Sequence, residues 1–247
     1  MDLKPGLQSF GALMAFPVRG EKWAEKMLIG SALVLLSFIV PVIPLIFVYG
    51  YAIRILLQAI AGENLELPAW RDWDKLASFG VRGLGVALIF TLPAMLVLLA
   101  GSALYMVSTI SLSATDGGAG WPMGLFFLGF GAWMLSIPVS SLLMLLAGVM
   151  TPPAMSHFAV RDRFSAAFYF REWWHILTGN KMGFLVAWVF LLGVGGLAYW
   201  AVVMLSYTLF LCWLVPLLLA PLTYYLSVVG AVLFGACYRD GMIARYS

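Results

Sequence analysis

Charged residues are scarce in this sequence. Only 10% of its 247 residues are Asp, Glu, Lys or Arg, 63% are hydrophobic, and the mean hydropathy is +0.99. A soluble domain carries about 25% charged residues and is about half apolar, so this chain needs lipid as its solvent. The composition therefore excludes an ordinary soluble domain. It predicts an all-α polytopic integral membrane protein of the cell (cytoplasmic) membrane, folded as a single membrane domain over residues 1–247.

Cysteine is almost absent, and the two examples are Cys212 and Cys237. They lie near opposite ends of one apolar stretch. On a helix that rises about 1.5 Å per residue they would be about 38 Å apart, too far for a disulfide within the chain. We interpret both as small apolar packing residues.

Motifs of known enzyme chemistry are also missing. The sequence has no P-loop, dinucleotide fingerprint, H-E-x-x-H or G-x-S-x-G pattern. Glu63, Glu66, Asp72 and Asp74 lack the ordered spacing of a calcium loop. A net charge of +3 from dispersed basic residues does not indicate nucleic-acid binding. We expect no catalytic residue, cofactor or metal, although an enzyme is not excluded.

Long apolar runs are what the sequence has in place of these. The stretches 83–107, 123–150, 182–206 and 209–237 contain no charged residue. Each reaches the length of about 20 residues that one helical crossing of a bilayer needs. A further stretch, 27–61, differs because Pro41 and Pro44 interrupt it and Arg54 lies in its second half.

The basic residues indicate how the chain is threaded. All 14 lie before, within or just after stretch 27–61, between stretches 123–150 and 182–206, or at the end of the chain. They are Lys4, Arg19, Lys22, Lys26, Arg54, Arg71, Lys75, Arg82, Arg161, Arg163, Arg171, Lys181, Arg239 and Arg245. Cytoplasmic connections are enriched in Lys and Arg, so these segments belong on one side of the membrane. A single crossing by 27–61 would break this pattern.

We therefore predict that residues 27–61 form a re-entrant helical hairpin with Pro41 and Pro44 at its tip. The hairpin follows an N-terminal interfacial segment, 1–26, and the four spanning helices then place both termini in the cytoplasm. The alternative is one proline-kinked helix that crosses the membrane.

Two polar connections read as amphipathic interfacial helices. Residues 69–80 place Trp70 and Trp73 on one face, and residues 161–178 contain Trp173 and Trp174. Tryptophan is enriched at headgroup depth, so these four residues are predicted membrane-interface anchors. The competing interpretation of each connection is a polar site, with Arg54, His157 and His175 as its candidates. A structural arginine and headgroup-facing imidazoles are the simpler interpretation.

The segments FPVRGEKW, GYAIRILLQAIAGENLELPAWRDWDKL and FGVRGL carry a resemblance to a known family. Their pattern of G-Y, L-P-x-W and D-W resembles a family of bacterial and archaeal multi-pass membrane proteins, domain of unknown function 4013. The residues that match are Gly50, Tyr51, Leu67, Pro68, Trp70, Asp72 and Trp73. The resemblance implies a membrane location and a helical fold, and it implies no activity.

Three functions fit these observations. Glycines allow helices to approach closely, so we expect a non-enzymatic structural or accessory subunit that packs on membrane lipids and on other membrane proteins or itself. The glycines of the apolar stretches are Gly124, Gly129, Gly131, Gly193, Gly195, Gly196, Gly230 and Gly235. The alternative is a transporter or channel for a small or lipid-like solute, favoured by the broken first segment. The third is a membrane-shaping protein.

Overall fold

A computed structural model describes residues 14–63, 66–114, 120–207 and 213–246. All regular secondary structure in these residues is helical, which confirms the all-α prediction. The helices are η1 (Phe16–Val18), α2 (Trp23–Leu36), α3 (Ile43–Ala61), α4 (Trp73–Ser113), α5 (Trp121–Arg161), η2 (Phe164–Phe168), α6 (Phe170–Gly179), α7 (Lys181–Ser206) and α8 (Leu214–Tyr246). Cys212 and the start of the predicted segment 1–26 lie outside the described residues.

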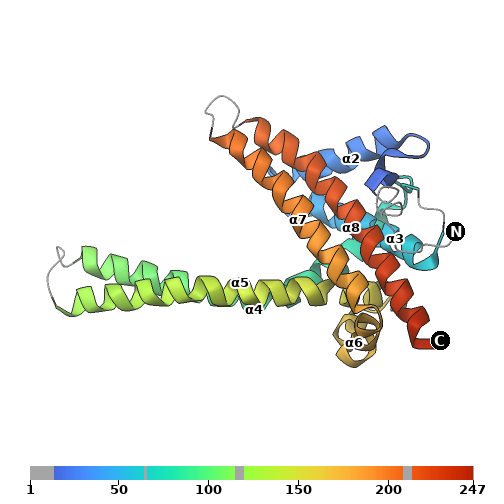
Figure 1. The fold of residues 1–247 in the computed structure, drawn as a ribbon. Coiled ribbons are helices and arrows are strands. Elements are labelled where there is room, and N and C mark those ends of the chain that lie inside the picture. Colours follow the sequence, from blue (N-terminus) through green and yellow to red (C-terminus); the bar gives the residue numbers. More distant parts are fainter. Residues whose placement is uncertain (1–13, 64–65, 115–119, 208–212, 247) are drawn as a thin grey trace. The chain divides into compact units, whose positions relative to one another are not determined.

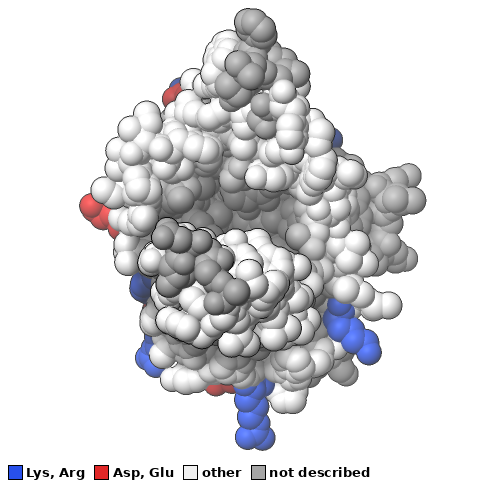
Figure 2. All heavy atoms as spheres, turned by 90° about the vertical axis from the view of Figure 1, so that its left-hand side faces the viewer, with Lys and Arg blue, Asp and Glu red and all other residues white. Residues whose placement is uncertain are grey.

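Five of these helices are long and apolar enough to cross a bilayer: α3, α4, α5, α7 and α8. Large apolar side chains are exposed along them, and most atoms visible in Figure 2 belong to uncharged residues. A multi-pass membrane protein has these properties, because lipid is the only solvent that such surfaces tolerate.

Contacts divide the chain into two compact units, where the sequence indicated a single domain. The first comprises Met1–Gly85 and Pro152–Ser247, and the second comprises Val86–Thr151. Helices α4 and α5 therefore each contribute to both units. The functional residues discussed below belong to the first unit.

Helix α8 is the central element of the first unit. It packs against α2, α3, α6 and α7, and Figure 1 shows α7 running alongside it in the opposite direction. Tyr224, Val228 and Val232, spaced four residues apart, are fully buried. This spacing places them on one stripe of the helix, which forms the centre of the core.

The break predicted at the prolines is present. Helix α2 ends at Leu36, and α3 begins at Ile43 with Pro44 in its first turn, where proline is tolerated. Val42 between them adopts a φ of 75°, a left-handed conformation that is uncommon for a β-branched residue. Pro41 is exposed and Pro44 is buried.

Helices α3 and α4 pack antiparallel through two glycines. A Cβ atom on Gly50 would collide with the Leu76 carbonyl oxygen, and one on Gly80 would collide with the Ile46 carbonyl oxygen. The two backbones therefore touch at both positions. Only glycine allows so close an approach.

The second unit is an antiparallel pair formed by the later part of α4 and the earlier part of α5. Gly101 packs on Ser136, and Gly129 packs on Ser108, so the glycine and serine of each helix are seven residues apart. Both serine hydroxyls donate to a carbonyl three residues back in their own helix. The seam consists of small residues, as in many membrane helix pairs.

The two predicted interfacial helices differ from the structure. No separate helix occupies 69–80: residues 69–72 are not helical, and α4 then runs without a break from Trp73 to Ser113. The predicted helix 161–178 is divided, because α5 continues to Arg161 and is followed by η2 and α6. The glycines after Trp73 do not end the helix, since they face neighbouring helices.

Candidate functional site

An aromatic cluster joins α3, the connection after it, the start of α4 and α8. We define this cluster as Tyr51, Trp70, Trp73 and Tyr224. The rings of Tyr51 and Trp70 are stacked with centroids 4.0 Å apart, and Trp70 and Trp73 are 5.7 Å apart. The ring of Tyr224 lies 6.0 Å from Tyr51 and 6.2 Å from Trp70. Trp70 and Trp73, two of the predicted interface anchors, therefore pack against other aromatic side chains of the protein.

Hydrogen bonds attach the same connection to α2 and α3. The Tyr51 hydroxyl donates to the Pro68 carbonyl at 2.8 Å, and Lys26 Nζ donates to the Leu67 carbonyl at 2.6 Å. The Trp70 indole nitrogen donates to the Lys26 carbonyl at 3.0 Å. The first turns of α2 and the chain after α3 thus lie side by side.

Helix α2 lies on α8 through one glycine. The backbone of Gly30 faces the ring of Tyr224 so closely that an added Cβ would overlap it. The Tyr224 hydroxyl approaches that of Tyr51 but makes no hydrogen bond of good geometry with the described residues. This tyrosine acts mainly through its ring.

Arg54 lies beside the start of α4. Its guanidinium is 3.9 Å from the Asp72 carboxylate and 3.5 Å from the Arg71 carbonyl. Asp72 has a φ of 59°, and its carbonyl accepts the first helical hydrogen bond of α4, from Leu76. The position of Arg54 fits the structural role that the sequence suggested for it.

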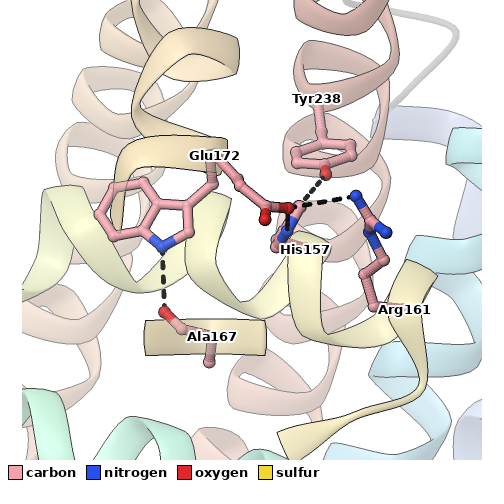
Figure 3. A network of polar contacts seen from close by, with 6 residues as sticks. His157, Arg161, Ala167, Glu172 and Tyr238 are labelled. Atoms are coloured by element: carbon pink, nitrogen blue, oxygen red, sulfur yellow. Dashed lines mark hydrogen bonds and ion pairs between the residues drawn. The ribbon is translucent and has the colours of Figure 1, made fainter. Parts of the chain in front are cut away.

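A polar network joins the end of α5 to α6 and α8. We define it as His157, Arg161, Glu172 and Tyr238 (Figure 3). His157 Nδ1 is 2.7 Å from the Tyr238 hydroxyl, and His157 Nε2 is 3.1 Å from Glu172 Oε2. Arg161 is 3.1 Å from the same carboxylate oxygen. The four side chains come from three helices, and Tyr238 of α8 is 81 residues from His157.

The neutral imidazole satisfies both contacts of His157. Protonated on Nε2, it donates to the Glu172 carboxylate and accepts from the Tyr238 hydroxyl on Nδ1. His157 is 4% exposed and Tyr238 is 1% exposed. A substrate cannot reach either group in this arrangement, so the network fastens α6 to α5 and α8.

The rotation of α6 is set by Trp173. This residue is 0% exposed and its indole nitrogen donates to the Ala167 carbonyl at 3.0 Å. A headgroup anchor must be exposed, so the role predicted for Trp173 does not fit its position. Trp174 is exposed on the same helix. His175 is exposed there too and takes no part in the network, so the structure does not bring His157 and His175 together as one site.

Arg82 connects α4 to the chain after α5. Its guanidinium donates to the side chain and carbonyl of Asp162, at 2.8 and 3.2 Å. It also lies over the rings of Phe79 and Phe158, at 5.0 and 5.5 Å from their centroids. These contacts hold the first turns of α4 against the end of α5 and the residue that follows it.

Three residues of the network were missed by sequence reasoning. Arg161 and Glu172 lie in a connection that was recognised as polar, but nothing marked them as partners of His157. Tyr238 carries no signal at all, since it follows an apolar run and is 81 residues from His157. Among the described residues, no group of three or more His, Cys, Asp or Glu is placed to hold a metal ion.

The comparisons agree with the residue pattern. Residues 33–207 match the family model described as "Protein of unknown function (DUF4013)". Comparison with the curated proteins and with the solved structures finds no match. The matched range contains Gly50, Tyr51 and the connection that packs on them, and it covers well over half of the chain, so this protein belongs to the DUF4013 family.

Proposed function

We propose that this protein is a non-enzymatic structural or accessory subunit that packs against other membrane proteins. One observation carries the proposal: the residues that match the family pattern are used to hold the fold. Gly50 contacts α4, and Tyr51 and Trp70 bind each other and the connection between α3 and α4. Asp72 is the one charged residue among those that match, and it lies 3.9 Å from the Arg54 guanidinium, so the pattern favours packing over a reactive site open to substrate.

Uncovered helix faces support the same proposal. Gly124 and Gly131 on α5, and Gly193 and Gly196 on α7, have nothing within 4 Å of the position of an added Cβ. Glycine in a membrane helix is unfavourable unless it allows a close contact or a bend. Contact with a neighbouring protein gives these four positions a role that packing within the chain does not give.

The test is purification of the tagged protein from its native membrane in a mild detergent. We expect it to co-elute with another membrane protein or with itself, and the double variant G124L/G131L to lose this association because the added side chains separate the helices. I137F adds bulk at another exposed position of α5 and is the control. Elution of the wild-type protein as a lone monomer would contradict the proposal.

The proposal includes a topology, in which α2 and α3 form a re-entrant hairpin and both termini are cytoplasmic. Helix α2 has 14 residues. It is therefore about 21 Å long, short of the bilayer core of about 30 Å. The contacts of Lys26 with Leu67 and Trp70 support entry and exit on one side. The exposed apolar residues Phe38 and Ile39 at the tip suit lipid.

Cysteine labelling tests this topology. In a background with Cys212 and Cys237 replaced by alanine, E21C and E63C are expected to react with a membrane-impermeant maleimide only from the cytoplasmic side. I39C is expected to react from neither side, because the tip lies within the bilayer. Labelling of E21C from outside the cell would rule out the hairpin.

Membrane shaping is a second candidate, favoured by the exposed apolar tip of the α2–α3 segment. A wedge that enters from one side and stops inside the bilayer expands one leaflet more than the other. Vesicles reconstituted at high protein density should then be smaller or tubular in electron micrographs. An unchanged size distribution, compared with protein-free vesicles of the same lipid, would remove this candidate.

A further inference from the structure

The two basic connections of the chain differ in charge balance once their ion pairs are considered. In the connection after α5, both acidic residues are taken up: Asp162 pairs with Arg82, and Glu172 pairs with Arg161 and His157. Arg163, Arg171 and Lys181 are exposed, and none of them forms an ion pair with the described part of the chain. This connection therefore presents positive charge without compensation.

The connection after α3 is balanced in comparison. Its exposed cations Arg71 and Lys75 lie among Glu63, Glu66 and Asp74, which are exposed and form no ion pair with described residues. With three exposed acids beside two exposed cations, this connection has no excess of positive charge to attract anions. The net charge of the whole sequence does not reveal this difference, which comes from where the charged residues lie along the chain and is increased by the ion pair of Asp162 with Arg82.

Helix α6 presents one of these cations, Arg171, on its exposed face. Trp173, Ile176 and Leu177 are buried against the protein, whereas Arg171, Trp174, His175 and Thr178 are exposed. The exposed positions are separated by three or four residues, so they share a face of the helix. The bond of Trp173 to Ala167 and the polar network fix the rotation that turns this face outward.

Exposed aromatic residues surround the cations. Phe164, Tyr169, Phe170 and Trp174 are exposed in the same connection. An aromatic ring lies favourably at headgroup depth in a bilayer, and Lys or Arg beside it reaches the lipid phosphates. Cations with interleaved aromatics thus match the chemistry of a lipid surface, and the excess of positive charge matches an anionic one.

We propose that the exposed cations of this connection, Arg163, Arg171 and Lys181, together with the exposed side of α6, bind the headgroups of anionic phospholipids in the adjoining leaflet. The acids of the connection are neutralised by Arg82 and Arg161, and this leaves the three cations available to lipid. The connection after α3 contributes no such preference. The inference concerns lipid selectivity and is independent of whether the protein is an accessory subunit.

The experiment uses the full chain in nanodiscs that contain equal amounts of phosphatidylglycerol and phosphatidylcholine with the same acyl chains. Native mass spectrometry after transfer to a mild detergent counts the lipids that remain bound. We expect the wild-type protein to retain more phosphatidylglycerol than phosphatidylcholine. In R163Q/R171Q/K181Q the ratio of bound phosphatidylglycerol to bound phosphatidylcholine should fall at least about fivefold. A single cation near an anionic surface contributes about 1 kcal/mol of binding free energy, and this energy corresponds to a factor of about five in the binding constant.

Two further variants make the test specific. R71Q/K75Q removes two exposed cations from the balanced connection and should leave the preference unchanged. R163K/R171K keeps the charge and should retain the preference, which separates loss of charge from loss of folding; size-exclusion profiles verify that each variant is folded. Equal retention of both lipids by the wild-type protein, or an equal loss in R71Q/K75Q, would overturn the proposal.

Discussion

The hydroxyl of Tyr51 in α3 donates a hydrogen bond of 2.8 Å to the carbonyl of Pro68, in the connection that leads to α4. Both residues are buried. Removing the hydroxyl would leave a buried carbonyl without this donor, at a cost of about 1–3 kcal/mol. We expect Y51F to lower the unfolding temperature in detergent measurably. Y199F changes an exposed tyrosine of α7 and should have no effect. Equal stability of the two variants would contradict this role of Tyr51.

The glycine contacts between α3 and α4 predict opposite effects for chemically identical substitutions. G50A and G80A place a methyl group against a backbone carbonyl of the other helix and should destabilise by about 1–3 kcal/mol or more. G131A meets open space and should be neutral or stabilising by up to about 1 kcal/mol, because alanine favours the helix. Thermal unfolding of the purified variants in one detergent measures the difference. A loss of stability in G131A as large as that in G50A would refute the packing described here.

The two histidines should respond differently to the same change. H157L removes the imidazole that bridges Glu172 and Tyr238, and we expect a loss of about 1–3 kcal/mol because polar groups near it lose a partner. H175L alters an exposed position of α6 and should leave stability nearly unchanged. Limited proteolysis after α5 provides a local readout, since release of α6 should speed cleavage in H157L alone. Similar cleavage rates in the two variants would show that the network does not fasten α6.

The contacts of Arg82 divide into an ion pair and two ring contacts. The ion pair with Asp162 is partly exposed, so a double-mutant cycle between R82A and D162A should give a coupling of no more than about 1 kcal/mol. R82A itself should cost more than D162A, because it also loses the contacts with Phe79 and Phe158. Chemical denaturation of the four proteins of the cycle measures both quantities. If the coupling energy equalled the whole loss of unfolding free energy in R82A, the contacts with the two rings would contribute nothing, contrary to this prediction.

The helical class and the break at Pro41 follow from the sequence for simple reasons. Lipid requires helices whose backbone groups are satisfied internally, and proline interrupts a helix at the position where it occurs. The apolar stretches were also long enough to be recognised one at a time. Each of these features depends on neighbouring residues and needs no knowledge of what packs against them.

The start and continuity of α4 could not be predicted in the same way. Gly80 in an isolated helix is unfavourable by about 1 kcal/mol, so a break near it was a reasonable expectation. In the structure its backbone touches Ile46 of α3, and this packing outweighs the helix propensity. Trp70 lies outside any helix, where its indole donates to the Lys26 carbonyl and stacks on Tyr51.

The polar network shows the same limit. His157 was identified as a candidate, yet its partners Glu172 and Tyr238 come from other helices, 15 and 81 residues away. Helical periodicity relates residues within a turn or two and carries no information on such distant pairs. Their meeting depends on how α5, α6 and α8 pack.

The small-residue seam between α4 and α5 implies that this pair of helices can change length. The hydroxyls of Ser108 and Ser136 each donate to a carbonyl of their own helix. The alignment of the two helices therefore depends on each serine facing a glycine of the other helix, and it needs no hydrogen bond between the helices. Seven residues make two turns of a helix to within about 20°. Inserting seven residues into both helices beyond the seam would therefore lengthen the pair by two turns while Gly101 still faces Ser136 and Gly129 still faces Ser108.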